Sequence, residues 1–178
     1  EKWTVLDDGK SLRFKLRQGV KFHDGTEMTA EDVKWSFDRV IRTPSARSGE
    51  IKRYIEKTEV VDKYTVDVFT TAPSPALLER MECYMAIVPK HLYEGKEDEL
   101  GSKPVGTGPW KMVEHRKPDW YKLEAFEEHF SRVPKVKTMT YRLIPEAATR
   151  WAAFRAGEVD ICDITGTPFV KEAKGMSD

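Results

Sequence analysis

The sequence predicts a mixed α/β fold, and three patterns support that prediction. Segments with alternating apolar residues flank tight-turn sequences, a capped amphipathic helix follows the first such pair, and a strand–helix–strand pattern fills much of the last third. The chain has 178 residues, enough for one domain or two small ones, and 39% of them are hydrophobic. We therefore expect a globular chain in which helices and sheets share a core.

Two hairpins are predicted in the first half of the chain. Residues 3–6 and 12–16 form the first, because the intervening residues 7–10, Asp-Asp-Gly-Lys, favour a tight turn. Residues 58–61 and 64–69 form the second, with apolar side chains at alternate positions of the later segment. Both pairs are expected to be antiparallel.

A capped amphipathic helix is predicted between Thr29 and Pro44. Thr29 is a favourable N-cap residue, and Glu31 and Asp32 follow it in the first turn. Trp35 lies off the apolar stripe, and we expect it to pack on a neighbouring layer. The stripe itself has helical spacing and consists of Val33, Phe37, Val40 and Ile41.

The middle of the chain alternates loops with short elements. The polar residues 45–50 indicate a loop, and residues 76–82 a short helix. The apolar run 84–88 predicts a buried strand, and residues 89–93 a helical turn with proline at its start. Residues 95–103 are highly charged, which is typical of a surface loop.

The last part of the chain predicts a parallel crossover. Residues 110–113 and 121–126 first form an antiparallel pair. Residues 136–144 then predict a strand, 146–156 a helix that Gly157 stops, and 159–164 a second strand. Strand, helix and strand joined by short turns make a right-handed βαβ unit.

Residues 104–110, PVGTGPW, lie between these two regions. A nucleotide loop would need a helix after its glycines, but Pro109 and Trp110 begin a strand, and Gly9-Lys10-Ser11 lacks the first glycine of a phosphate loop. The position instead indicates an interdomain connection. We assign that role to Gly106, Thr107, Gly108 and Pro109, and expect both glycines to adopt backbone conformations that are costly for other residues.

Charge and cysteine content limit the kinds of partner. Thirty basic and thirty acidic residues cancel, so recognition of nucleic acid by bulk charge is not expected. The longest apolar run, 83–88, is too short to cross a bilayer. Cys83 and Cys162 suit either two buried thiols or a long-range disulfide. We expect them not to be bonded to each other, because they fall in different predicted domains.

The sequence offers little for catalysis or metal binding. The four histidines show no metal-ligand spacing, and no nucleophile-elbow motif is present. His23-Asp24 resembles a base with its carboxylate, but Asp24-Gly25 is better explained as a turn. Arg150 faces away from the apolar stripe of its helix, either as a solvated charge or as a partner for a carboxylate across a domain interface. We expect no enzyme activity, cofactor or metal.

Four segments, in this order and spacing, carry a family resemblance: DDGKSLRFKLRQGVKFHDGTEMTAEDVKWSFDRV, VPKHL, PVGTGPW and RLIPEAATRWAAFRAGEVDI. Over residues 1–165 the chain resembles the extracytoplasmic solute-binding proteins of peptide-type ABC importers, which include dipeptide, oligopeptide and nickel receptors. It departs from them at His129-Phe130-Ser131, where the family often has an aromatic pair followed by glycine.

The resemblance implies part of a periplasmic-binding-protein-like fold. Residues 1–103 would be a small accessory domain inserted in the first lobe and 104–178 part of that lobe, while the second lobe and the N-terminal strands would be absent. Ligands of this family bind in a cleft between lobes that close by hinge rotation. These residues alone are therefore expected to bind weakly. The cleft-facing residues would be Ser45, Arg47, Tyr54, Tyr84 and Met85, which would equally suit ordinary surface and core.

The implied function is the substrate-binding component of an ABC transporter. Such a protein captures peptides or similar small solutes outside the cytoplasm and delivers them to permease subunits in the membrane. It would be periplasmic, or extracellular and anchored as a lipoprotein. The alternatives are a receptor for nickel complexes, sugars or opines, and the ligand-sensing domain of a regulator.

Overall fold

The computed structural model describes residues 1–6, 9–43, 49, 51–74 and 76–175. The predicted turn residues Asp7 and Asp8, and the predicted loop 45–50 apart from Gly49, lie outside these ranges.

The chain divides into two compact units. The first comprises Glu1–Met112 and Leu123–Thr138, and the second Val113–Lys122 and Met139–Asp178. These limits differ from the predicted boundary at residue 103, so the 104–110 segment lies inside the first unit. Assignment of residues to parts of a binding-protein lobe stays a prediction.

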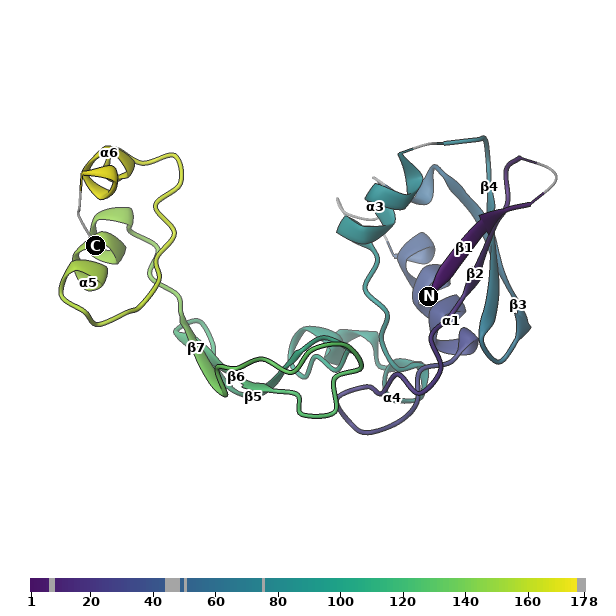
Figure 1. The fold of residues 1–178 in the computed structure, drawn as a ribbon, viewed down its shortest axis with the longest axis horizontal. Helices are drawn as coiled ribbons and strands as arrows, with labels where there is room; N and C mark the ends of the chain where they lie inside the picture. Colours follow the sequence, from purple (N-terminus) through teal and green to yellow (C-terminus); the bar gives the residue numbers. More distant parts are fainter. Residues whose placement is uncertain (7–8, 44–48, 50, 75, 176–178) are drawn as a thin grey trace. The chain divides into compact units, whose positions relative to one another are not determined.

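The first unit contains a four-stranded antiparallel sheet of order β1-β2-β4-β3 (Figure 1). Its strands are β1 (Lys2–Val5), β2 (Leu12–Lys15), β3 (Ile55–Asp62) and β4 (Thr65–Thr70). Both predicted hairpins are confirmed. The sequence patterns did not predict that β2 pairs with β4, which places β4 inside the sheet and buries nearly all of its residues.

Helix α1 (Ala30–Arg42) packs against this sheet and confirms the predicted amphipathic helix. At its start the Thr29 N–H donates to Asp32 Oδ2 at 2.9 Å, which satisfies a donor that the helix leaves free. Trp35 packs away from the sheet in a second cluster with Val88 and Tyr93, as predicted. The main core consists of Leu12, Ala30, Val33, Phe37, Val40, Ile51, Ile55, Val66, Val68, Leu77 and Met81.

Two predicted short helices are confirmed, α3 (Leu77–Tyr84) and α4 (Lys90–Tyr93), and a 3-10 turn, η1 (Glu97–Gly101), lies within the predicted charged loop. The strand predicted at 84–88 is wrong. A strand needs a partner for its backbone groups, but the Ser36 hydroxyl takes up those of Val88, accepting from its N–H at 3.1 Å and donating to its carbonyl at 3.3 Å.

A second sheet has the order β5-β6-β7. It contains β5 (Trp110–Arg116), β6 (Trp120–Ala125) and β7 (Thr138–Arg142). The first two confirm the predicted pair, and β7 confirms a shorter form of the strand predicted at 136–144.

Helices α5 (Ala147–Arg155) and α6 (Phe169–Lys174) follow in the second unit. As predicted, Gly157 ends the α5 region; its φ is 72°, and its N–H donates to the Phe154 carbonyl at 3.0 Å. The strand predicted at 159–164 is wrong, so the predicted crossover is incomplete: Ile161 is 86% exposed, and no strand of the described part of the chain pairs with this segment.

Cys83 and Cys162 are both free thiols, which confirms the prediction that they are not bonded. Cys83 is exposed, however, so the alternative of two buried thiols is wrong for it. Among the described residues, no helix combines the length and apolar character that a membrane span needs.

Candidate functional site

Of the residues predicted to face a ligand, Ser45 and Arg47 lie outside the described ranges, whereas Tyr54, Tyr84 and Met85 are each partly buried. Tyr54 precedes β3, and its carbonyl accepts from the Thr71 N–H at 3.0 Å. This bond holds the backbone at the start of the strand, from which the tyrosine side chain extends.

The Tyr54 ring lies near two guanidinium groups. The Cζ atoms of Arg53 and Arg80 are each 5.2 Å from the ring centroid, a cation–π distance. Arg80 belongs to α3, so this contact joins α3 to the chain that enters β3. Neither arginine was predicted as a site residue.

Tyr84 follows Arg80 by one helical turn, so the two side chains lie on the same face of α3. Met85 ends the helix and, like Tyr54, packs against the main core. We call Arg53, Tyr54, Arg80 and Tyr84 the Tyr54 patch. It combines aromatic rings with guanidinium donors, which suit the carboxylate and carbonyl groups of a solute.

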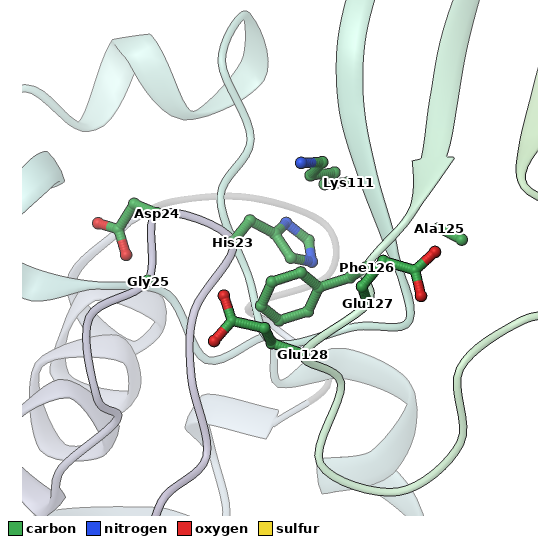
Figure 2. A pocket seen from close by; sticks show the side chains of 8 residues that line it. All are labelled: His23, Asp24, Gly25, Lys111, Ala125, Phe126, Glu127 and Glu128. Atoms are coloured by element: carbon green, nitrogen blue, oxygen red, sulfur yellow. The ribbon is translucent and has the colours of Figure 1, made fainter.

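A shallow depression of about 230 Å³ lies elsewhere in the first unit (Figure 2). It is formed by the turn at residues 23–25, the start of β5, the last residue of β6 and the residues that follow β6. It is lined by His23, Asp24, Gly25, Lys111, Ala125, Phe126, Glu127 and Glu128.

His23 uses its backbone and both ring nitrogens on one segment. Its N–H donates to the Gly106 carbonyl at 2.9 Å, and Nδ1 accepts from the Gly106 N–H at 3.3 Å. Nδ1 is therefore unprotonated, and Nε2 carries the hydrogen donated to the Gly108 carbonyl at 2.9 Å. Burial lowers the pKa of His23, so the ring is neutral at neutral pH.

The expectation that Gly106 and Gly108 hold conformations costly for other residues is wrong. Neither has a positive φ. A Cβ on Gly106 would come no closer than 4.0 Å to the Ile87 carbonyl oxygen, and one on Gly108 would meet nothing within 4 Å. Hydrogen bonds to His23, rather than a strained backbone, hold this segment. The assignment of Gly106, Thr107, Gly108 and Pro109 as an interdomain connection stays a prediction.

Asp24 does not orient His23. Its Oδ2 lies 2.9 Å from His91 Nε2, and its Oδ1 accepts from the Thr26 N–H at 3.0 Å. Figure 2 shows the Asp24 carboxylate pointing away from the His23 ring. Burial raises the pKa of Asp24, but the bonds from Thr26 and His91 outweigh it and leave the pKa below its usual value. With Gly25 at a φ of 89°, the predicted turn is confirmed.

In the second unit, Arg150 has a structural role that neither predicted alternative described. Nη1 donates to the carbonyls of Ile144 at 2.7 Å and Pro145 at 2.6 Å, and Nε donates to that of Asp163 at 2.9 Å. The guanidinium thereby ties the start of α5 to the segment after it. Within the described ranges, no group of three or more His, Cys, Asp or Glu residues could hold a metal ion.

Comparisons with known proteins give a consistent result. The sequence matches the family described as "Bacterial extracellular solute-binding proteins, family 5 Middle" over residues 1–178. A glutathione-binding protein of Escherichia coli O1:K1 / APEC is 33% identical over 165 residues, covering 89% of this chain and 31% of the relative. The chain thus spans about a third of the length of the curated relatives it matches.

Two solved structures are similar in fold as well as sequence. The oligopeptide-binding protein AppA from Bacillus subtilis, in complex with a nonapeptide, gives a TM-score of 0.77 at 30% identity, covering 89% of this chain and 33% of that one. The protein MoaA from A. tumefaciens R10, in complex with mannopinic acid, gives a TM-score of 0.81 at 33% identity, covering 90% and 33%.

Proposed function

Because the chain belongs to family 5 of the bacterial extracellular solute-binding proteins, we propose that it forms part of the solute-capturing component of an ABC importer. Its fold is the mixed α/β, periplasmic-binding-protein-like fold predicted from the sequence, of which the chain covers a part. The family match over all 178 residues is the observation that carries this proposal.

The proposed ligand is a peptide or a similar small solute that carries a carboxylate. Glutathione, a nonapeptide and mannopinic acid, the solutes named with the similar proteins, share that group. In this chain the Tyr54 patch offers the complementary chemistry, because guanidinium groups donate to carboxylates and an aromatic ring covers apolar parts of a solute. Nickel complexes, sugars and opines remain the alternative ligands, and the opines overlap with the proposed class where they carry a carboxylate, as mannopinic acid does.

The proposed arrangement is a two-lobed receptor. Residues 1–103 would form the accessory domain of the first lobe, and residues 104–178 part of that lobe's own structure. Ser45, Arg47, Tyr54, Tyr84 and Met85 would face the solute. Closure of a second lobe would then bury most of the solute surface, which is how such a cleft gains affinity without covalent chemistry.

The protein would work in the periplasm, or outside the cell on a lipid anchor, and pass its solute to permease subunits. The family description, bacterial extracellular solute-binding proteins, supports this location. A ligand-sensing domain of a regulator is the second candidate, since such a domain would need the same capture step. Neither function involves catalysis or nucleic acid binding by these residues.

Isothermal titration tests this function on the natural gene product that contains these residues. The solutes are glutathione, a dipeptide, a nonapeptide, mannopinic acid and a nickel–histidine complex, each injected separately. We expect saturable binding of at least one of them with no change to the solute. Absence of binding by every solute, or conversion of any solute to a product, would contradict the proposal.

A further inference from the structure

His23 fastens the turn at residues 21–27 to the segment Gly106–Pro109 through three hydrogen bonds, one of which depends on the protonation state of its ring. We propose that His23 is a pH-sensitive clasp, whose protonation at Nδ1 removes the acceptor of the Gly106 N–H and loosens the segment.

The geometry makes the bond to Gly106 the sensitive one. A neutral ring accepts at Nδ1 and donates from Nε2, which fits both Gly106 and Gly108. An imidazolium ring donates from both nitrogens, so two donors would then face each other at Nδ1. The bond to the Gly108 carbonyl and the backbone bond to the Gly106 carbonyl would persist. Protonation therefore changes one contact and leaves the rest of the fold in place.

Burial of the ring contributes most to the lowered pKa of His23, and the bond to the Gly108 carbonyl opposes it. Lys111 on β5 and His129 after β6 also lower the pKa because they repel a positive ring, whereas Asp24 attracts one. Glu127 and Glu128 line the same depression, but each carboxylate is already paired, Glu127 with Lys137 and Glu128 with Lys21.

Packing adds to this control. The ring is partly buried and meets Phe126 edge to face at 5.2 Å and 77° (Figure 2). Phe126 itself donates its backbone N–H to the Pro109 carbonyl at 2.8 Å. Phe126 therefore contacts both the ring and the segment that the ring holds, and the Gly106 N–H is the group that loses its acceptor when Nδ1 gains a proton.

If the proposed function holds, the clasp adds a regulation to it. A receptor outside the cytoplasm meets the pH of the medium, and the segment that His23 holds is the one assigned to the interdomain connection. Loosening that segment in acid would weaken retention of a bound solute. The clasp can be tested without any solute, so its failure and the failure of the proposed function are separable.

The test is amide hydrogen exchange of Gly106 in the natural protein, corrected for intrinsic exchange rates, at about pH 7.5 and at a pH below the midpoint that the His23 ring itself shows in nitrogen-15 spectra, since its pKa is lowered. We expect protection of Gly106 to fall by roughly tenfold in acid, as when a part-buried N–H loses its acceptor. His23→Gln should abolish this pH dependence, because its amide neither titrates nor loses its acceptor oxygen. His115→Gln is the matched control and should behave like the parent, since His115 neither lines the depression nor is among the groups that shift the pKa of His23.

Equal protection of Gly106 at both pH values, or the same pH dependence in His23→Gln, would overturn the proposal. If His23→Gln fails to fold, nitrogen-15 spectra of the parent protein test the proposal instead. The Gly106 amide resonance should titrate with the same midpoint as the His23 ring. The proposal would also be overturned if the His23 ring titrated while the chemical shift of the Gly106 amide did not change.

Discussion

Arg13 and Asp67, 54 residues apart in sequence, form a bidentate ion pair between neighbouring strands. Arg13 Nε and Nη2 each lie 2.7 Å from a different carboxylate oxygen of Asp67. The two residues are direct partners in the β2–β4 register. The Asp67 side chain is 8% exposed and that of Arg13 37% exposed, so the carboxylate depends on the pair more than the guanidinium does.

This asymmetry gives a stability prediction. Arg13→Met leaves a buried carboxylate without its cation and should lower the melting temperature by roughly 5–10 °C. Asp67→Asn leaves a guanidinium that water can reach, and should cost about half of that or less. Lys57→Met, which removes an exposed pair with Glu59, is the control and should change little. Equal losses from the two Arg13–Asp67 variants would contradict this account.

Glu27 should contribute stability that is lost in acid. Its carboxylate accepts from Lys63 Nζ at 2.9 Å, the Gly19 N–H at 2.9 Å and the Tyr64 hydroxyl at 2.8 Å. The Lys63 bond contributes most, and together these bonds lower the pKa of Glu27 from 4.5 to about 2. The contribution is present in full above the unfolded-state pKa and is lost as the pH falls toward the folded-state value.

Glu27→Gln should therefore lower the melting temperature at neutral pH by roughly 2–4 °C. The difference between parent and variant should shrink from about pH 5 to about pH 2.5, because the parent loses the carboxylate over that range. Glu59→Gln, on the exposed side of β3, is the matched control. A difference that stays constant with pH would show that the Glu27 charge is not what stabilises the turn.

The glycines should divide by backbone conformation. Gly108→Ala should leave stability unchanged or raise it slightly, because φ is not positive and a Cβ has room. Gly157→Ala should cost about 1–2 kcal/mol, because an alanine at a φ of 72° is strained. Urea unfolding of both variants checks this. A larger loss at Gly108 than at Gly157 would restore the interpretation drawn from sequence.

Tyr84 should matter for solute binding more than for folding. Tyr84→Ala should raise the dissociation constant of the best solute about tenfold or more, the effect of losing an aromatic contact, with a small change in melting temperature. Tyr141→Ala is a suitable control, since Tyr141 is 50% exposed and stacks on Tyr121 in the second unit. Unchanged affinity in Tyr84→Ala would remove Tyr84 from the site.

Local patterns predicted the elements whose stability is local. Thr29 and Asp32 mark the start of α1, because a helix end needs partners for its N–H groups. Gly157 marks the end of α5, because it adopts the positive φ of a helix-ending turn. Apolar alternation likewise located the strands of both hairpins. These features depend on residues within a few positions of each other, so a single sequence contains them.

The predictions that were wrong or absent concern contacts between residues that are far apart in sequence. Ser36 bonds the backbone of Val88 across 52 positions, and a continuous apolar run there resembled a strand. Arg150 reaches a carbonyl 13 positions away, which no periodicity predicts. At the candidate site, the nearness of Arg80 to Tyr54 depends on how α3 docks. Only the helical spacing from Arg80 to Tyr84 was available as a signal.

Native mass spectrometry of the natural gene product, purified without denaturation, tests the central claim most directly. We predict a complex whose additional mass matches that of a small solute. Denaturation should release this solute unchanged, and its fragmentation should identify a peptide or another carboxylate-bearing compound. The account would be contradicted if the spectrum showed the unliganded mass alone, both before and after incubation with the five solutes named above. It would also be contradicted if the released compound had been chemically altered by the protein.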